Sequence, residues 1–192
     1  DWDHSGNGQN VTLSPGTYYG GIQISGNSNT ITFEPGVYIL AGGGLKISGG
    51  SNTLQNDTDS GIGGVMFFNT ESEPDNDDFD DLSFSGDNDV NLSAPTSGDY
   101  AGVLFFQDPD SDSAESSLEF SVSGSVDMQL DGTVYMPDHD IDYSGTSSTS
   151  MRCTKLIGNT IEFSGTTGTS IPESCASDSV SLSANSGVRL RG

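Results

Sequence analysis

Cationic side chains are scarce in this sequence. Its 192 residues include 5 Lys and Arg against 28 Asp and Glu, which gives a formal net charge of -23 at pH 7. Neutralising the phosphates of a nucleic acid requires a basic patch, and five scattered cations cannot form one. An anionic membrane surface is disfavoured as a partner for the same reason. We therefore expect no nucleic-acid partner.

Long apolar runs are also missing. No stretch approaches the ~18–20 apolar residues of a membrane-spanning helix, and no signal peptide is present. The chain opens abruptly at Asp1, which is compatible with removal of a signal or anchor. A mass of 20.0 kDa suits one continuous core better than two. We predict one domain over residues 1–192 that does not insert into a membrane.

The apolar residues that are present alternate with polar ones in short stretches. They are mostly β-branched or aromatic, as in Val11–Leu13, Ile22–Ile24 and Ile31–Phe33. Alternation with period two is typical of strands that are buried on one face. No stretch repeats apolar residues at helical spacing, so we predict an all-β protein.

One short phrase recurs through the chain: an apolar residue, then Ser, then Gly or, once, Ala. It occurs at Ile24–Gly26, Ile47–Gly49, Phe84–Gly86, Val122–Gly124, Tyr143–Gly145, Phe163–Gly165 and Leu182–Ala184. The steps from Ser to Ser are 23, 37, 38, 21, 20 and 19 residues. Two longer phrases also repeat: Val11–Tyr18 returns at Ile31–Tyr38, and Gly64–Asn69 returns at Gly102–Gln107 and Gly132–Pro137.

A step near 20 residues is typical of one turn of a parallel β-solenoid. Each turn would contain about three strands, with glycine at the corners that need a positive φ. The steps of 37 and 38 residues would hold one turn plus an insertion, at the acidic stretches Glu71–Asp81 and Asp108–Glu119. We predict a single right-handed parallel β-solenoid, the hand following the general crossover preference. A β-sandwich is the alternative.

Several segments resemble a known family. They are Pro15–Ile22, Phe33–Leu45, Ala94–Asp108, Val134–Pro137 and Cys153–Ile157, of which Ala94–Asp108 is the most specific. Together they resemble the C-terminal β-helical domain of bacterial TadG-like and pilus-assembly-related surface proteins. The resemblance runs from about Val11 to Phe163 and implies an exported, envelope-associated or pilus-associated protein of the same right-handed fold. It implies no particular reaction, and this sequence departs from it in its missing anchor and its high acidity.

The two cysteines, Cys153 and Cys175, are separated by about one predicted turn. Neighbouring turns of a solenoid lie about 4.8 Å apart, within reach of a disulfide when the positions stack. An exported protein would oxidise such a pair, so we predict a structural disulfide. A two-thiol metal site is the alternative, but His4 and His139 form no spaced metal motif with either cysteine.

Asp108, Asp110 and Asp112 alternate along the chain as the ligands of a calcium loop do. The segment lacks the Gly and the Glu that complete such a loop. Acidic loops exposed to solvent are the alternative interpretation. Calcium is therefore the one candidate cofactor, with these three residues as its candidate ligands.

Asp138, Asp140 and Asp142 would share one face of a strand, with about 6.5–7 Å between neighbours. That spacing suits the two carboxylates of an inverting glycosidase. The alternative is a polar outer face, with Ile141 and Tyr143 on the inner side. We predict the polar outer face and no enzyme activity.

The remaining features indicate structure or adhesion. The ends carry no amphipathic capping helix, so copies could stack into a filament. We predict a non-enzymatic structural or adhesive protein exported to the bacterial surface, associated with a pilus or self-assembling. Its partners would be further copies of itself, pilus or envelope proteins, or neutral glycans. A glycan-binding or glycan-hydrolysing solenoid is the alternative, and an ice-binding face is disfavoured because Thr30 and Thr32 form the one Thr-x-Thr strand.

Overall fold

The structure, a computed structural model, describes residues 1–56, 63–72, 79–109, 118–146, 148–151, 153–166 and 168–170. Every regular element in these residues is a β-strand, and the strands pair in parallel. The described part of the chain contains no helix with the length and apolarity to cross a membrane. The prediction of an all-β chain is confirmed.

The strands form three parallel sheets, which we call sheets A, B and C. Sheet A contains, in order, β1 (Trp2–His4), β4 (Ile22–Ile24), β7 (Leu45–Ile47), β10 (Leu82–Phe84), β13 (Glu119–Val122), β16 (Asp140–Tyr143) and β19 (Ile161–Phe163). Sheet B contains β2 (Asn10–Leu13), β5 (Thr30–Phe33), β8 (Gly50–Asn56), β11 (Asp87–Ser93), β14 (Asp127–Asp131), β17 (Ser148–Met151) and β20 (Gly168–Ser170). Sheet C contains β3 (Gly16–Tyr19), β6 (Gly36–Ala41), β9 (Val65–Thr70), β12 (Val103–Gln107), β15 (Thr133–Met136) and β18 (Lys155–Gly158).

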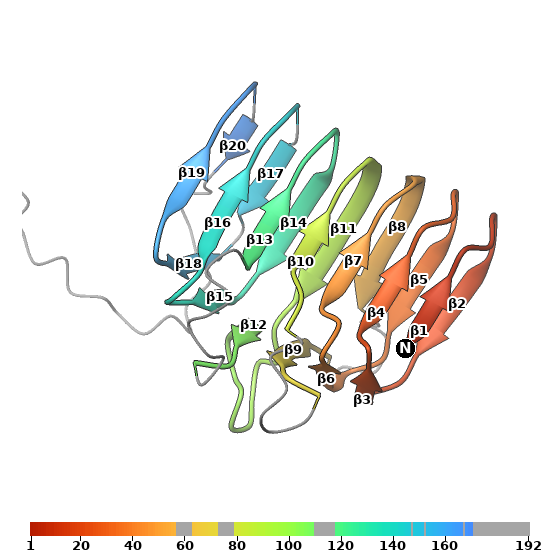
Figure 1. Cartoon of the computed structure of the whole chain (residues 1–192), viewed down its shortest axis with the longest axis horizontal. Coiled ribbons are helices and arrows are strands. Elements are labelled where there is room, and N and C mark those ends of the chain that lie inside the picture. Colours follow the sequence, from red (N-terminus) through yellow and green to blue (C-terminus); the bar gives the residue numbers. More distant parts are fainter. Residues whose placement is uncertain are drawn as a thin grey trace, which may run out of the picture.

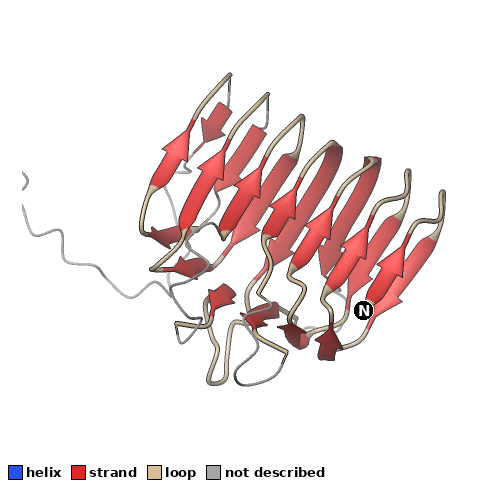
Figure 2. Ribbon diagram, in the orientation of Figure 1, coloured by secondary structure: helices blue, strands red, loops and turns tan. Residues whose placement is uncertain are grey.

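Each strand pairs with the strand three positions along the chain. One pass of the chain therefore adds one strand to sheet A, one to sheet B and one to sheet C, before the next pass begins beside it. Figure 1 shows this order as a colour gradient along the molecule, and Figure 2 shows sheet A in front of sheet B. The arrangement is compatible with the predicted solenoid.

The repeated Ser-Gly phrase forms the corner between sheets A and B. Six of its seven copies lie at this corner, and Leu182–Ala184 lies outside the described residues. The corner glycines stack so closely that a Cβ on Gly124 would lie 2.6 Å from the carbonyl oxygen of Gly86, at a φ of 79°. Gly6 starts this column, and a Cβ on Gly26 would overlap its carbonyl oxygen. The sequence pattern missed this first corner because His4 occupies the apolar position.

The extra length of the two long passes is divided between two corners, which corrects the prediction. The acidic stretches do lie between sheets C and A, where β10 follows β9 and β13 follows β12. The connections from sheet B to sheet C also contain more residues in these two passes, 57–64 between β8 and β9 and 94–102 between β11 and β12. The sequence repeat could not show this because the counted phrase marks only the A–B corner.

The repeated N-terminal phrase does not keep one register. Val11 pairs with Ile31 in sheet B, as the repeat predicts. In sheet C, however, Gly16 pairs with Tyr38, two residues beyond the position predicted from the repeat. A shift of two residues leaves the same side chains facing inward, so the core tolerates it.

The core is a continuous stack of apolar side chains between the three sheets. Aromatic rings run through it, with centroid distances of 5.2 Å between Phe67 and Phe105 and 5.3 Å between Phe105 and Phe120. All three rings are fully buried. Burial of equivalent residues from successive passes accounts for the stability of the stack, since aromatic pairs stabilise beyond their buried area.

A row of buried asparagines fixes the A–B corner. The Oδ1 atom of Asn52 accepts a hydrogen bond from the backbone N–H of Asn29 at 3.0 Å, and Oδ1 of Asn88 accepts one from Asn52 at 3.0 Å. The Nδ2 group of Asn52 donates to the carbonyl oxygen of Gly26 at 2.8 Å. In the next pass Val126 takes the equivalent position, so the row ends at Asn88.

Candidate functional site

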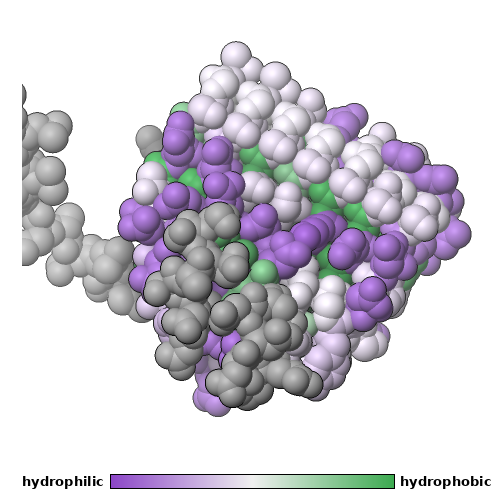
Figure 3. Space-filling view, viewed as in Figure 1, coloured by the Kyte–Doolittle hydropathy of each residue, from purple (hydrophilic) through white to green (hydrophobic). Residues whose placement is uncertain are grey.

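The outer face of sheet A holds two of the residues that the sequence singles out for chemistry, Asp140 and Asp142. Most of its strands are short, and their middle residue faces outward while its neighbours enter the core. The outward residues in order are Asp3, Gln23, Lys46, Ser83, Ser121, Asp142 and Glu162. Figure 3 shows hydrophilic side chains on this side of the molecule, below a ridge of residues of intermediate hydropathy.

Five carboxylates gather on this face, one directly before β10 and four on β13, β16 and β19, and we call them the carboxylate row: Asp81, Glu119, Asp140, Asp142 and Glu162. Glu119 pairs directly with Asp140, and Asp142 with Glu162. Asp81 accepts the backbone N–H of Glu119 at 2.9 Å. Like charges opposite one another destabilise a sheet, so the row carries an electrostatic cost.

The pKa values of two groups reflect this setting. Partial burial raises the pKa of the Glu119 carboxyl, and the charges of Asp81, Asp142 and Asp140 raise it further. Burial lowers the pKa of the His139 imidazole, against the opposing effect of nearby carboxylates. Glu119 therefore holds its proton to a higher pH than an ordinary Glu, while His139 tends to stay neutral.

The predicted strand face of Asp138, Asp140 and Asp142 is partly wrong. Strand β16 begins at Asp140, and Asp138 lies in the exposed turn before it. Asp140 and Asp142 do share the outer face, while Ile141 and Tyr143 are buried, as predicted. Two outward carboxylates two residues apart, beside a Glu with a raised pKa, have the groups that acid–base hydrolysis of a glycosidic bond requires.

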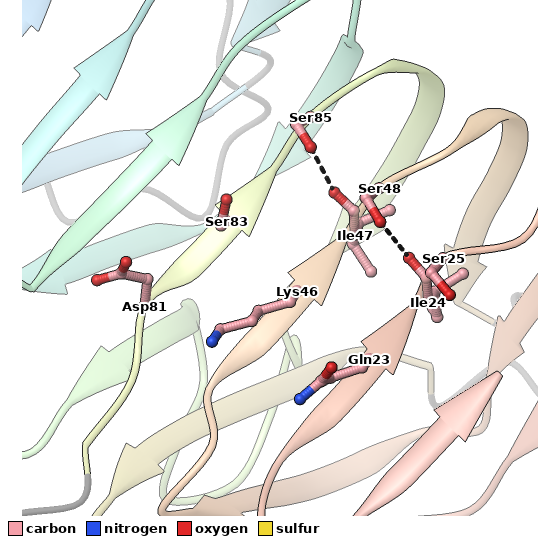
Figure 4. Close-up of a pocket in the computed structure, with 9 residues that line it drawn as sticks. All are labelled: Gln23, Ile24, Ser25, Lys46, Ile47, Ser48, Asp81, Ser83 and Ser85. Atoms are coloured by element: carbon pink, nitrogen blue, oxygen red, sulfur yellow. Dashed lines mark hydrogen bonds between the residues drawn. The ribbon is translucent and has the colours of Figure 1, made fainter. Parts of the chain in front are cut away.

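A shallow pocket lies on the same face beside the carboxylate row. It is lined by Gln23, Ile24, Ser25, Lys46, Ile47, Ser48, Asp81, Ser83 and Ser85. Figure 4 shows Lys46 and Asp81 on neighbouring strands at one side, and two Ser hydroxyls that donate to backbone carbonyl oxygens. Lys46 forms an ion pair with Asp80, so its charge is already compensated.

The predicted calcium ligands are only partly described. Asp108 follows β12, where its carboxylate accepts a hydrogen bond from the Thr70 hydroxyl at 2.8 Å. Asp110 and Asp112 lie outside the described residues, so this site remains a prediction. Among the residues that are described, no group of three or more His, Cys, Asp or Glu is placed to hold a metal ion.

The predicted disulfide also remains a prediction. Cys153 is half-buried between β17 and β18, while Cys175 lies outside the described residues. Peptide mass mapping without reduction would test the pair directly.

A row of aromatic side chains that the sequence repeat did not predict lies on the outer face of sheet C. The row consists of Phe68, Phe106 and Tyr135, on β9, β12 and β15. The repeated Gly64–Asn69 phrase contains the signal, because period-two alternation places one Phe of each pair inward and the next outward.

Comparisons of the chain with models of protein families, with curated proteins and with solved structures found no match.

Proposed function

We propose that the chain is a single right-handed parallel β-solenoid that acts as a non-enzymatic structural or adhesive protein at the bacterial surface. Its partners would be further copies of itself or proteins of the pilus or cell envelope. The right-handed crossover preference of parallel strands supports the hand, and the resemblance of Ala94–Asp108 to pilus-related surface proteins supports the location.

The observation that carries the proposal is the unbroken parallel pairing of strands through the three sheets. Each pass pairs with the previous one in all three sheets, so outward positions of successive strands lie side by side. A scaffold of this kind suits repetitive contact with a surface or with further copies. In the described chain, Trp2, Val11 and Tyr18 of the first pass pack on the core but are only partly buried. They give this end an apolar surface on which another copy can stack.

Size-exclusion chromatography with light scattering and negative-stain microscopy of the whole chain test self-assembly. We expect concentration-dependent oligomers or filaments, and we expect Val11→Asp to abolish them by placing charge on the apolar end. Thr12→Asp is the matched control, because it adds the same charge on the exposed outer face of β2. Monomers at every concentration would reject self-assembly. Antibody labelling of intact cells tests the surface location.

A second candidate function is glycan hydrolysis at the carboxylate row. Asp140 and Asp142 on one face, next to Glu119 with its raised pKa, favour it. The test is release of reducing sugar from neutral and acidic polysaccharides. Activity that is lost in Asp140→Asn would establish the enzyme, and no product from any polysaccharide would reject it.

A further inference from the structure

The aromatic row on sheet C is continuous and in register. Phe68 pairs with Phe106 and Phe106 with Tyr135, at ring-centroid distances of 5.7 Å and 5.0 Å. Ile39 extends the row at one end and Ile157 at the other. Five successive strands therefore present apolar side chains at one outward position.

This row lies outside the core. The neighbouring rings Phe67 and Phe105 are fully buried, whereas Phe68, Phe106 and Tyr135 are half-buried and Ile157 is 42% exposed. A contiguous apolar strip that stays in contact with solvent marks an interaction surface. The strip runs along the stack, so it suits an extended ligand with a repeating unit.

Polar groups border the aromatic row on the same face. Thr70 and Asp108 lie two residues beyond Phe68 and Phe106, and the Thr70 hydroxyl donates to the Asp108 carboxylate at 2.8 Å. A carboxylate accepts several hydrogen bonds. The face therefore offers an apolar strip with a hydrogen-bonded Thr-Asp pair at one side.

The charge of the chain restricts what can occupy this face. A net charge of -23 repels nucleic acids, anionic polysaccharides and anionic membranes, and it also opposes packing of a second copy side by side. A neutral polysaccharide carries no charge, and it has apolar C–H surfaces together with hydroxyl donors. It matches both parts of the sheet C face.

We propose that the outer face of sheet C binds a neutral polysaccharide along Phe68, Phe106 and Tyr135, with Asp108 accepting hydrogen bonds from its hydroxyl groups. The inference rests on the proposed adhesive function and names the ligand and the surface that it uses.

Co-sedimentation of the whole chain with insoluble cellulose and with chitin tests this inference. We expect binding to at least one of them, and about tenfold weaker binding in Tyr135→Ser and in Phe106→Ser, as for central residues of an interface. Tyr135→Phe keeps the ring and should retain most of the affinity. Phe163→Ser is the matched control, because it removes a partly exposed ring that stacks on Tyr143 in sheet A.

Thermal melts establish that each variant is folded, and Tyr135→Ser alone suffices if Phe106→Ser does not fold. The inference is overturned if neither polysaccharide is bound, or if the row variants bind as the unmodified chain does. It is also overturned if polygalacturonate or phosphatidylglycerol vesicles bind equally well. Filaments or surface labelling would persist in those cases, so failure here is distinguishable from failure of the proposed function.

Discussion

Asn52 holds the backbone of Asn29, one pass earlier in the chain, through a buried hydrogen bond of 3.0 Å. The same side chain donates to the carbonyl oxygen of Gly26, and the backbone N–H of Asn52 donates to Oδ1 of Asn88. Because these groups are buried, none of them can exchange its partner for water without opening the corner. The asparagine row therefore holds successive passes together at the A–B corner, where the corner glycines also stack.

Replacement of Asn52 by Ala should strongly destabilise the protein. It leaves the N–H of Asn29 and the carbonyl oxygen of Gly26 buried without these partners, at a cost of about 2–3 kcal/mol. We expect Tm to fall by about 5–10 °C in a calorimetric scan. Asn91→Ala is the control, since Asn91 is exposed on the outer face of β11. Equal shifts in the two variants would contradict the role of the buried row.

The corner glycines should tolerate no side chain. Gly86 has a φ of 94°, and the Cβ introduced by Gly86→Ala would overlap the carbonyl oxygen of Gly49. We expect a loss of about 3–5 kcal/mol by denaturant titration, from strain and overpacking together. Gly98 has a nearly equal φ of 90° but nothing within 4 Å of a new Cβ. Gly98→Ala should therefore cost only about 1–2 kcal/mol, and a similar loss in both variants would show that stacking adds nothing.

Stability should depend on pH through Glu119. Its pKa is higher in the folded chain than in the unfolded chain, so folding is favoured most when it is protonated, below the unfolded pKa. That advantage is lost as the pH rises through the folded pKa. Gln cannot ionise, so Glu119→Gln avoids the loss of stability that ionisation of Glu119 causes. We therefore expect the variant to raise Tm at pH 7 and to leave Tm nearly unchanged at pH 3. Asp99→Asn is the control, because it removes an exposed carboxylate outside the carboxylate row and should change Tm less than Glu119→Gln does. A lower Tm at pH 7 in Glu119→Gln than in the unmodified chain would refute this account.

High salt should stabilise the protein. Carboxylates face each other directly at Glu119 and Asp140, at Asp142 and Glu162, and at Asp89 and Asp127. Raising sodium chloride from about 0.1 M to about 1 M shortens the electrostatic screening length from about 10 Å to about 3 Å. Relief of several like-charge pairs should raise Tm by about 4–10 °C.

The control for this effect is a variant with one carboxylate of each pair removed: Glu119→Gln, Asp142→Asn and Asp127→Asn together. Its Tm should rise less steeply with salt than that of the unmodified chain. A slope equal to that of the unmodified chain would mean that these pairs do not set the salt response.

The strands and most of the corners follow from local sequence patterns. Alternation of apolar residues is a local property, and it correctly predicted that Ile141 and Tyr143 enter the core. The Ser-Gly corner is also local, because the glycine adopts a positive φ in five of the six copies that the structure describes. These features need only neighbouring residues, so they can be read from the chain.

The alignment of successive passes depends on tertiary packing. The two-residue shift that pairs Gly16 with Tyr38, and the division of the extra residues between two corners, depend on how whole passes pack. The same alignment brings Phe106 beside Tyr135 and Glu119 beside Asp140. Period-two alternation along a strand predicts which face a side chain occupies. The register between passes determines which side chain on the next strand lies beside it.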